Sequence, residues 1–285
     1  MKYLLIISCL LFTSVGWSKT INSVDLIEKD GLYYEKFTDV PFTGKVTGAK
    51  QGKIKKGKIK GKWKEYWESG TLKKSFTIKK GLYDGQYIEY YENGNLMWKG
   101  NQKEGNQVGE WLHYYENGQL DYKENYIYLY GFGYKDGESL SYYENGQLRQ
   151  KGNYKEDEKE GEWLDYWGNG QLRQKVNYKE DKIEGERLWY YENGQLGIKS
   201  NWKFFKKEGE YLEYDRNGNL NIKYNYNYGN KHGEQLTYWD NGQLRIKSNY
   251  KHGKEHGETL NYNKNGKLIK TEIYKDGELI ETITP

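Results

Sequence analysis

The strongest constraint on this chain is a pair of glycines that returns about every 24 residues. Nine glycines follow Asn or Ser in a turn signature, and the intervals between them are seven of 24 residues and one of 28. A second glycine lies nine residues before each of them, at Gly61, Gly85, Gly109, Gly137, Gly161, Gly185, Gly209, Gly233 and Gly257. Such self-similarity is typical of repeat proteins, in which each copy packs mainly against its neighbours. Each repeat is taken to begin at the earlier glycine of its pair, and the repeats are numbered 1 to 9 from Gly61 to Gly257. A place in a repeat is the number of residues after that first glycine, so Tyr66 is at place 5 of repeat 1.

Besides the two glycines, two places are invariant across the nine copies. Place 5 is tyrosine from Tyr66 to Tyr262, and place 11 is leucine from Leu72 to Leu268. The Asn-Gly pair between them predicts a β-hairpin with one of two turns. A two-residue Asn-Gly loop pairs place 7 with place 10, whereas a three-residue Glu-Asn-Gly loop pairs place 6 with 10 and place 5 with 11. We favour the second, because it sets the invariant tyrosine and leucine opposite each other.

This register assigns side chains to two faces. The odd places form a Leu/Tyr face, and the even places 2 and 6 carry most of the tryptophans. Place 14 is lysine in seven copies, and continuing the register sets it opposite place 2. We expect the lysine stem to lie along the aromatic ring while the ammonium stays in water.

Composition supports strands and not helices. The chain has one alanine, two prolines, 35 glycines and 31 tyrosines, and its hydrophobic residues total only 35%. Helix formers are scarce and aromatic strand formers abound. We therefore predict an all-β fold, an elongated single-layer antiparallel ribbon of about nine 24-residue hairpin repeats over residues 61–276. Residues 19–60 form an N-terminal cap with a degenerate repeat, and residues 277–285 add a closing strand.

The first 18 residues have the features of a signal peptide. Lys2 precedes the apolar run Tyr3–Phe12, and Gly16 and Ser18 occupy the small-residue positions of a cleavage site before Lys19. We expect export to the periplasm, the cell envelope or the medium. Cleavage would remove Cys9, the single cysteine.

The repeat resembles a known family. The order of glycine, aromatic strand, Asn-Gly turn and leucine is similar to the MORN repeat, in particular to the bacterial variant with a consensus like GxWxxYYxNGxL. The segment Asp30–Val46 also resembles the opening of bacterial proteins of this type, which are often labelled antitoxin components. The resemblance covers 61–276 well and 30–60 loosely. It implies a scaffold or membrane-proximal module. Some relatives accompany phosphoinositide kinase domains, but this chain has no glycine-rich phosphate loop.

Two groups of residues are candidates for binding. Place 2 is aromatic mainly in the first half of the chain, which predicts a ligand site at Trp63, Trp111 and Trp163 with Lys99, Lys123 and Lys151 beside them; ring packing against lysine stems is the alternative. Lys50–Lys62 contains seven lysines and no acid. It predicts anion binding to lipid head groups, acidic glycans or other polyanions, or else protection of a sheet edge. The predicted anion ligands are Lys53, Lys55, Lys56, Lys58 and Lys60.

The function we expect is a non-catalytic scaffold that binds protein or a membrane surface. The alternative is a carbohydrate-binding repeat protein. An enzyme is not expected, because the carboxylates recur with the period whereas an active site is normally unique, and His252 and His256 both precede turn glycines. No cofactor or metal is expected. A net charge of +4 gives no case for nucleic acid.

Overall fold

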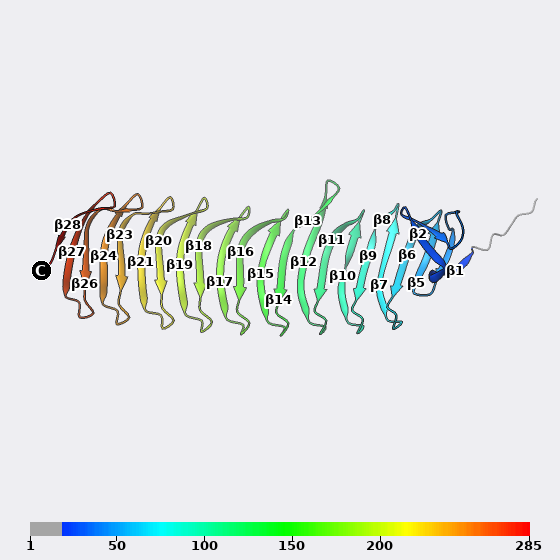
Figure 1. The fold of residues 1–285 in the computed structure, drawn as a ribbon, viewed down its shortest axis with the longest axis horizontal. Coiled ribbons are helices and arrows are strands. Elements are labelled where there is room, and N and C mark those ends of the chain that lie inside the picture. Colours follow the sequence, from blue (N-terminus) through cyan, green and yellow to red (C-terminus); the bar gives the residue numbers. More distant parts are fainter. Residues whose placement is uncertain (1–18) are drawn as a thin grey trace, which may run out of the picture.

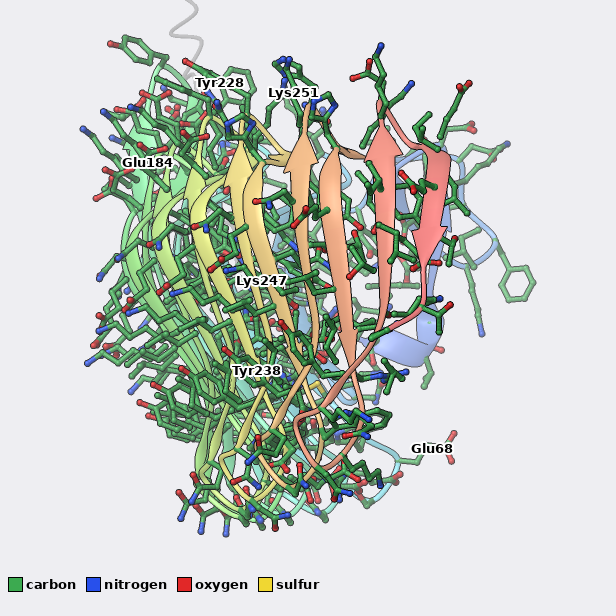
Figure 2. All side chains as sticks on the ribbon, turned by 90° about the vertical axis from the view of Figure 1, so that its left-hand side faces the viewer. Glu68, Glu184, Tyr228, Tyr238, Lys247 and Lys251 are labelled. Carbon is green, nitrogen blue, oxygen red and sulfur yellow. The ribbon has the colours of Figure 1, made fainter. Side chains whose placement is uncertain are left out.

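The chain forms one long open sheet. The computed structural model describes residues 19–285, so the predicted signal peptide lies outside the described residues. Twenty-six strands pair in a single sheet, and a separate pair, β2 and β3, lies at its N-terminal end. Figure 1 shows the strands side by side in one row from the N-terminal to the C-terminal end. Seen along the row, the strands are bowed (Figure 2). The predicted all-β ribbon of hairpin repeats is confirmed.

Each repeat contributes two main strands, and the first is divided in several copies. The N-terminal elements are β1 (Thr20–Asn22), the 3-10 helix η1 (Ser23–Asp25), β2 (Leu26–Lys29), β3 (Leu32–Glu35), β4 (Gly44–Thr47) and β5 (Lys50–Lys55). The strands of repeats 1 to 4 are β6 (Lys58–Tyr66), β7 (Leu72–Lys79), β8 (Leu82–Tyr83), β9 (Gly85–Tyr90), β10 (Leu96–Lys103), β11 (Asn106–Tyr114), β12 (Leu120–Leu129), β13 (Phe132–Lys135), β14 (Gly137–Tyr142) and β15 (Leu148–Lys155). Those of repeats 5 to 9 and the C-terminal strand are β16 (Glu158–Tyr166), β17 (Leu172–Lys179), β18 (Lys182–Tyr190), β19 (Leu196–Lys203), β20 (Lys206–Tyr214), β21 (Leu220–Asn227), β22 (Asn230–Lys231), β23 (Gly233–Tyr238), β24 (Leu244–Lys251), β25 (Lys254–Glu255), β26 (Gly257–Tyr262), β27 (Leu268–Lys275) and β28 (Glu278–Ile283).

The turn inside each hairpin has the predicted geometry. In repeat 1, Tyr66 pairs with Leu72, and the amide of Trp67 donates to the carbonyl of Thr71 at 2.8 Å. The last residue of the three-residue loop is a glycine whose φ lies between 77° and 89° in all nine copies. A residue with a Cβ is disfavoured at this φ, which explains why glycine recurs there.

The predicted position of the place-14 lysines is wrong. A β-bulge follows the Tyr–Leu pair, so place 4 pairs with place 13 instead of place 12. The shift by one residue sets Lys99 opposite Ile88 at place 3, and not opposite place 2. Because strand side chains alternate between faces, the lysines join places 1, 3 and 5 on one face, and places 2, 4, 13 and 15 lie on the other. We call these the lysine face and the core face.

The core face buries its place-2 tryptophans against glycines. Trp63, Trp111 and Trp163 are only 1%, 3% and 3% exposed. A Cβ at Gly100 would overlap the ring of Trp111, and a Cβ at Gly152 would overlap the ring of Trp163. Both glycines occupy place 15 of the preceding repeat. In several copies the residue at place 2 is smaller than tryptophan, and the residue at place 15 of the preceding repeat is then larger than glycine. Arg187 at place 2, for example, pairs with Val176 at place 15. The aromatic gradient along place 2 therefore has a packing explanation.

A cap covers the N-terminal end of the core face. β1 pairs in parallel with β4, and β4 begins the antiparallel series. A cluster of buried side chains lies here and contains Ile21, Phe42, Val46, Ile54, Trp63 and Phe76. Tyr33, from the β2–β3 hairpin, packs with its ring 6.4 Å from that of Trp63. Burial, followed by a hydrogen bond to Glu28, raises the pKa of Tyr33 to about 12. At the other end of the row, β28 pairs with β27.

The turns lie in two rows, one at each end of the strands, and we call these rows the two edges of the sheet. The Asn-Gly edge contains the hairpin turns at places 7 to 9. The inter-repeat edge contains the turns that join the second strand of one repeat to the first strand of the next. In Figure 2, Glu68 marks the Asn-Gly edge at the bottom, and Tyr228 and Lys251 mark the inter-repeat edge at the top. The insertion hairpin between β12 and β13 rises above its neighbours on the upper edge in Figure 1. Among the described residues, 19–285, we find no helix of the length and apolar character required for membrane crossing.

Candidate binding surfaces

The six residues predicted as a ligand site are divided between the two faces. Lys123 Nζ lies 3.0 Å from a carboxylate oxygen of Glu110, and Lys151 Nζ lies 3.4 Å from one of Glu138. A hydrogen bond from its ammonium to Glu110 raises the pKa of Lys123. In the repeat that contains Lys99, place 1 is Gln86, so Lys99 has no carboxylate at the position equivalent to Glu110. Lys123 and Lys151 thus belong to a periodic column of ion pairs on the lysine face, and Lys99 lies on the same face without such a partner.

The three tryptophans are packed inside the core face. The indole N–H of Trp111 donates to the carbonyl of Asn101 at 2.9 Å, and that of Trp163 donates to Asn153 at 3.2 Å. A ring that stacks on a ligand needs an exposed flat face, and these rings are almost fully covered. The geometry does not bring the tryptophans and lysines together into one site.

The predicted anion-binding lysines do lie together. Lys53, Lys55, Lys56, Lys58 and Lys60 are all exposed. Four of them, with Lys79 and Lys80, line a groove of about 880 Å³ that also contains Ile59 and Ile78; the four are Lys55, Lys56, Lys58 and Lys60. The groove lies on the inter-repeat edge, between the turn at Lys56 and the turn at Lys80. Among the residues that line it, there is no acid.

Like charges oppose each other in this segment. Lys53 pairs with Lys60 across the β5–β6 ladder, and Lys55 pairs with Lys58. Directly opposed like charges destabilise a sheet. Within residues 19–285, these four lysines have no carboxylate within 4.0 Å, whereas the place-14 lysines of repeats 3 to 8 are paired. An anion bound here would relieve the repulsion.

Exposed aromatic side chains also gather on the inter-repeat edge, which sequence reasoning missed. Tyr130 is 93% exposed, Phe204 68% and Phe205 60%. Phe132 and Tyr228 are exposed on the same edge. Within repeats 1 to 9, Leu82 and Ile269 complete the set of exposed large apolar side chains, and Leu82 also lies on this edge. A membrane or protein partner would cover such side chains.

The turn that carries Phe204 and Phe205 is strained. Their φ angles are 49° and 64°, in the left-handed region. Most other turns of this edge have glycine as the second residue, for example Gly229 after Tyr228. A left-handed conformation is unfavourable for a bulky residue, and such strain is concentrated at functional sites. The sequence signal was the absence of glycine from KFFK, Lys203–Lys206, at the position where seven of the nine other turns of this edge have one.

The Asn-Gly edge is uniform and internally bonded. The side-chain amide of Asn193 donates to the carbonyl of Arg216 in the next repeat at 2.8 Å, and its Oδ1 accepts from the amide of Gln195. The aromatic side chain at place 6 also donates a hydrogen bond to the next repeat; the hydroxyl of Tyr191, for example, donates to the carbonyl of Tyr214 at 3.0 Å. These bonds recur along the row, so this edge ties the repeats together.

The histidines do not converge on a common centre. His252 lies in a turn with φ 53°, and His256 Nδ1 lies 3.2 Å from Asp276. His113 Nδ1 lies 2.9 Å from Asp121. In the described part of the chain, no three His, Cys, Asp or Glu side chains are grouped so that they could hold a metal ion.

Comparisons with known proteins identify the repeat and little beyond it. Two solved structures are similar at low identity. One is "Crystal Structure of TcdB2-TccC3-Cdc42", with 15% identity, a TM-score of 0.19, and coverage of 79% of this chain and 15% of that chain. The other is a porin-like protein from Bacteroides uniformis, with 10% identity, a TM-score of 0.17, and coverage of 78% of this chain and 92% of that chain. A search of curated proteins gave no match.

The family model described as "MORN repeat variant" matches nine segments. They are residues 59–80, 83–103, 107–128, 135–156, 159–180, 183–203, 207–228, 231–252 and 255–276. Each segment contains one hairpin of the sheet, with its invariant tyrosine and leucine paired. Together they span most of the chain, and the chain belongs to the MORN repeat variant family.

Proposed function

We propose that this protein is an exported, non-catalytic repeat scaffold that docks on a negatively charged membrane surface through its inter-repeat edge. The observation that carries the proposal is the gathering of exposed aromatic side chains and a lysine-lined groove on that one edge. Repeats of this family generally interact with proteins or membranes. The sequence of residues 1–18 supports export to the cell envelope or the medium.

The chemistry of the edge suits a lipid surface. Aromatic rings partition to the boundary between head groups and acyl chains, and lysine stems can lie beside them while the ammonium reaches lipid phosphates. Lys203 Nζ lies 5.8 Å from the ring centre of Phe204, and Lys182 Nζ lies 5.5 Å from that of Phe205. Each exposed ring of this turn therefore has a cation beside it. The groove lined by Lys56, Lys58 and Lys60 adds a second basic contact.

The shape of the row favours a flat partner. The turns of the inter-repeat edge follow one another along the whole length of the sheet (Figure 1). A flat surface can contact several of these turns at once, whereas a globular protein would cover only a few. Each lysine near an anionic bilayer contributes about 1 kcal/mol, and the contribution falls with ionic strength.

Vesicle flotation tests the proposal. The purified protein is mixed with vesicles of phosphatidylcholine alone or with added phosphatidylglycerol. We expect salt-sensitive binding to the anionic vesicles only. The triple substitution Lys56→Gln, Lys58→Gln and Lys60→Gln should weaken this binding roughly a hundredfold, at about 1 kcal/mol per lysine.

The matched control removes three other lysines. Lys99→Gln, Lys123→Gln and Lys151→Gln change the net charge equally, but on the lysine face. This variant should lose much less affinity. Equal loss in the two triple variants, or equal binding to both kinds of vesicle, would contradict docking through the inter-repeat edge. If neither the protein nor its variants float with the vesicles, a lipid surface is excluded and an acidic protein is left as the partner.

A further inference from the structure

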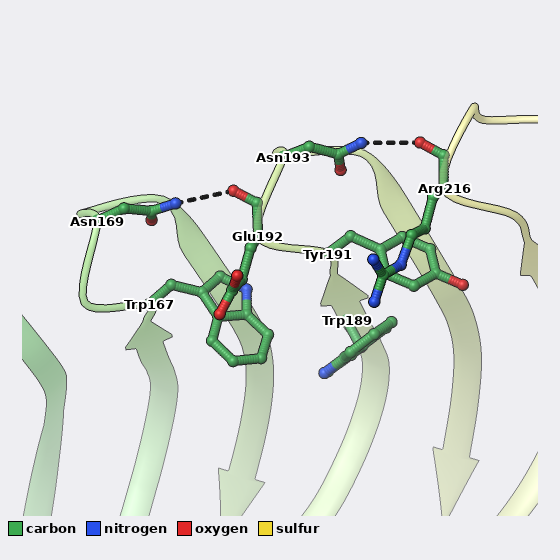
Figure 3. A pocket seen from close by; sticks show the side chains of 7 residues that line it. All are labelled: Trp167, Asn169, Trp189, Tyr191, Glu192, Asn193 and Arg216. Atoms are coloured by element: carbon green, nitrogen blue, oxygen red, sulfur yellow. Dashed lines mark hydrogen bonds between the residues drawn. The ribbon is translucent and has the colours of Figure 1, made fainter.

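A half-open pocket interrupts the uniform Asn-Gly edge at repeats 5 to 7. It has a volume of about 560 Å³ and is lined by Trp167, Asn169, Trp189, Tyr191, Glu192, Asn193 and Arg216. Figure 3 shows these side chains on three successive turns and, for Trp189, on strand β18, with the hydrogen bonds from Asn169 and Asn193 to the next turn drawn as dashed lines. The volume falls within the range of small-molecule sites.

The pocket depends on a pair of residues that breaks the period. Trp189 is the only tryptophan at place 4; the other copies have Glu65, Glu89, His113, Ser141, Asp165, Glu213, Thr237 and Asn261. Gly197 is the only glycine at place 12. A Cβ at Gly197 would overlap the Trp189 ring, so the ring requires this glycine. Eight copies form the same hairpin without this pair, and therefore the fold does not require it.

Three rings are held as a wall of the pocket. The ring centres of Trp189 and Tyr191 are 4.8 Å apart and their planes make an angle of 72°, and those of Trp167 and Trp189 are 6.5 Å apart at 77°. Trp167 donates to the carbonyl of Tyr190 at 3.1 Å, and Tyr191 donates to Tyr214 at 3.0 Å. All three rings are half-buried. They are fixed in position and still partly accessible.

Polar groups complete the lining. Asn169 and Asn193 each use one amide hydrogen for the bond to the next repeat, at 2.9 and 2.8 Å, which leaves the second hydrogen for a ligand. Glu192 and Arg216 are exposed at the same edge. Their charges are opposite, so these two lining side chains offer donors and acceptors whose charges balance.

This combination points to one class of ligand. A cation is unfavourable, because the guanidinium of Arg216 lies 5.7 Å from the ring centre of Tyr191 and that of Arg173 lies 5.1 Å from that of Trp167. An anion would meet Glu192, and a purely apolar ligand would leave the polar groups unpaired. A neutral sugar ring offers a C–H face for stacking and hydroxyl groups for the amides and the carboxylate. We infer that this pocket binds one residue of a neutral carbohydrate.

Titration of tryptophan fluorescence with neutral disaccharides tests the inference. Cellobiose, maltose, lactose and N,N′-diacetylchitobiose are the probes, and calorimetry with the same sugars provides a second readout. At least one of them should give saturable binding to the wild-type protein. The absence of saturable binding to all four, or preferred binding of choline or of an acidic sugar, would overturn the inference.

A variant that restores the period separates binding from folding. Trp189→Thr with Gly197→Arg reproduces places 4 and 12 of repeat 8, where Thr237 and Arg245 occur. It should keep the wild-type melting temperature and lose at least tenfold in sugar affinity. Trp239→Phe in repeat 8 is the matched control and should bind as the wild type does. Unchanged affinity in the double variant would also overturn the inference. Vesicle flotation is an independent readout, so its outcome does not decide this site.

Discussion

The two edges of the sheet follow opposite rules. At the Asn-Gly edge, the turns are nearly identical in sequence, and side chains bond each turn to the next, as from Asn169 to the carbonyl of Glu192. At the inter-repeat edge, the turns vary from Lys80-Gly81 to Glu180-Asp181 and Phe204-Phe205. The first edge is uniform because every copy must fit its neighbour. The turns of the second edge are joined through the backbone, as from the amide of Gly229 to the carbonyl of Lys207. Their side chains are therefore free to diverge, and the exposed aromatic rings and the lysine-lined groove are found there.

The largest change is expected from disturbing a turn of the Asn-Gly edge. Gly194 has φ 83°. Gly194→Val forces a β-branched residue into this conformation and should lower the free energy of unfolding by roughly 1–3 kcal/mol. Gly194→Asn should cost less, because asparagine tolerates positive φ. Hydrogen exchange should increase mainly in repeats near residues 185–208. An even increase from Gly61 to Asp276 would contradict local coupling between repeats.

A smaller loss is expected from removing one bond between neighbouring turns. Asn169 donates to the carbonyl of Glu192 and accepts from the amide of Gln171. Asn169→Ala removes both contacts and should destabilise the protein by about 1 kcal/mol, measured by urea unfolding. Lys182→Ala changes the inter-repeat edge in the adjoining repeat and should change stability by less. The reverse order would mean that the Asn-Gly edge does not tie the repeats together.

Alkaline pH should weaken the Asn-Gly edge. Burial raises the pKa of Tyr115 at place 6, whose hydroxyl donates to the carbonyl of Tyr142 in the next repeat at 2.8 Å, to about 12. Because this value exceeds the pKa of about 10 in an unfolded chain, the contribution to stability is complete below about pH 10 and is lost as the pH rises toward 12. Unfolding midpoints across this range should fall less in Tyr115→Phe than in the wild type. Identical slopes would contradict the assignment.

The smallest effect is expected on the lysine face. Lys199 Nζ lies 2.8 Å from Glu186, and both side chains are partly exposed. Glu186→Gln should lower the free energy of unfolding by no more than roughly 0.2–1 kcal/mol, and less at high salt. A loss that is larger than that of Asn169→Ala would show that the ion-pair column, and not the Asn-Gly edge, holds the row together.

The sequence predicted the repeat architecture because the period exposes it. The invariant Tyr66 and Leu72 were enough to choose between two turns, and their pairing is confirmed. The bulge after this pair has no residue signature, since place 12 is occupied by residues as different as Lys73, Asp121 and Gly197. The bulge adds one residue that the predicted register did not include, and this shift places the place-14 lysines on the opposite face.

The candidate sites were harder to predict than the fold. Trp111 and Trp163 suggested exposed platforms, but Gly100 and Gly152 in the preceding strands make room to bury them. That relation spans two repeats and depends on the register. The basic segment was recognised because five of its lysines lie close together in sequence, from Lys53 to Lys60, but the groove that four of them form with Lys79 and Lys80 was not predicted. The aromatic turn at Phe204 was missed, because it departs from glycine at one position only, Phe205, and two other turns have aspartate there.

One double variant tests the contrast between the edges. Phe204→Asn with Phe205→Gly gives this turn the sequence that a left-handed two-residue turn prefers. Relief of backbone strain should raise the free energy of unfolding by about 1–2 kcal/mol. Glu180→Asn with Asp181→Gly makes the same change in the preceding turn and is the matched control.

The decisive measurement is the affinity of these two variants for phosphatidylglycerol vesicles, with their stability determined in parallel. We expect the variant lacking Phe204 and Phe205 to be more stable than the wild type and to bind at least roughly tenfold more weakly, because a fully buried aromatic ring contributes about 1.5–3 kcal/mol. The control should gain stability and bind at least as well as the wild type. Unchanged vesicle affinity without the two rings, or a loss of stability on their removal, would contradict the assignment of this edge to binding.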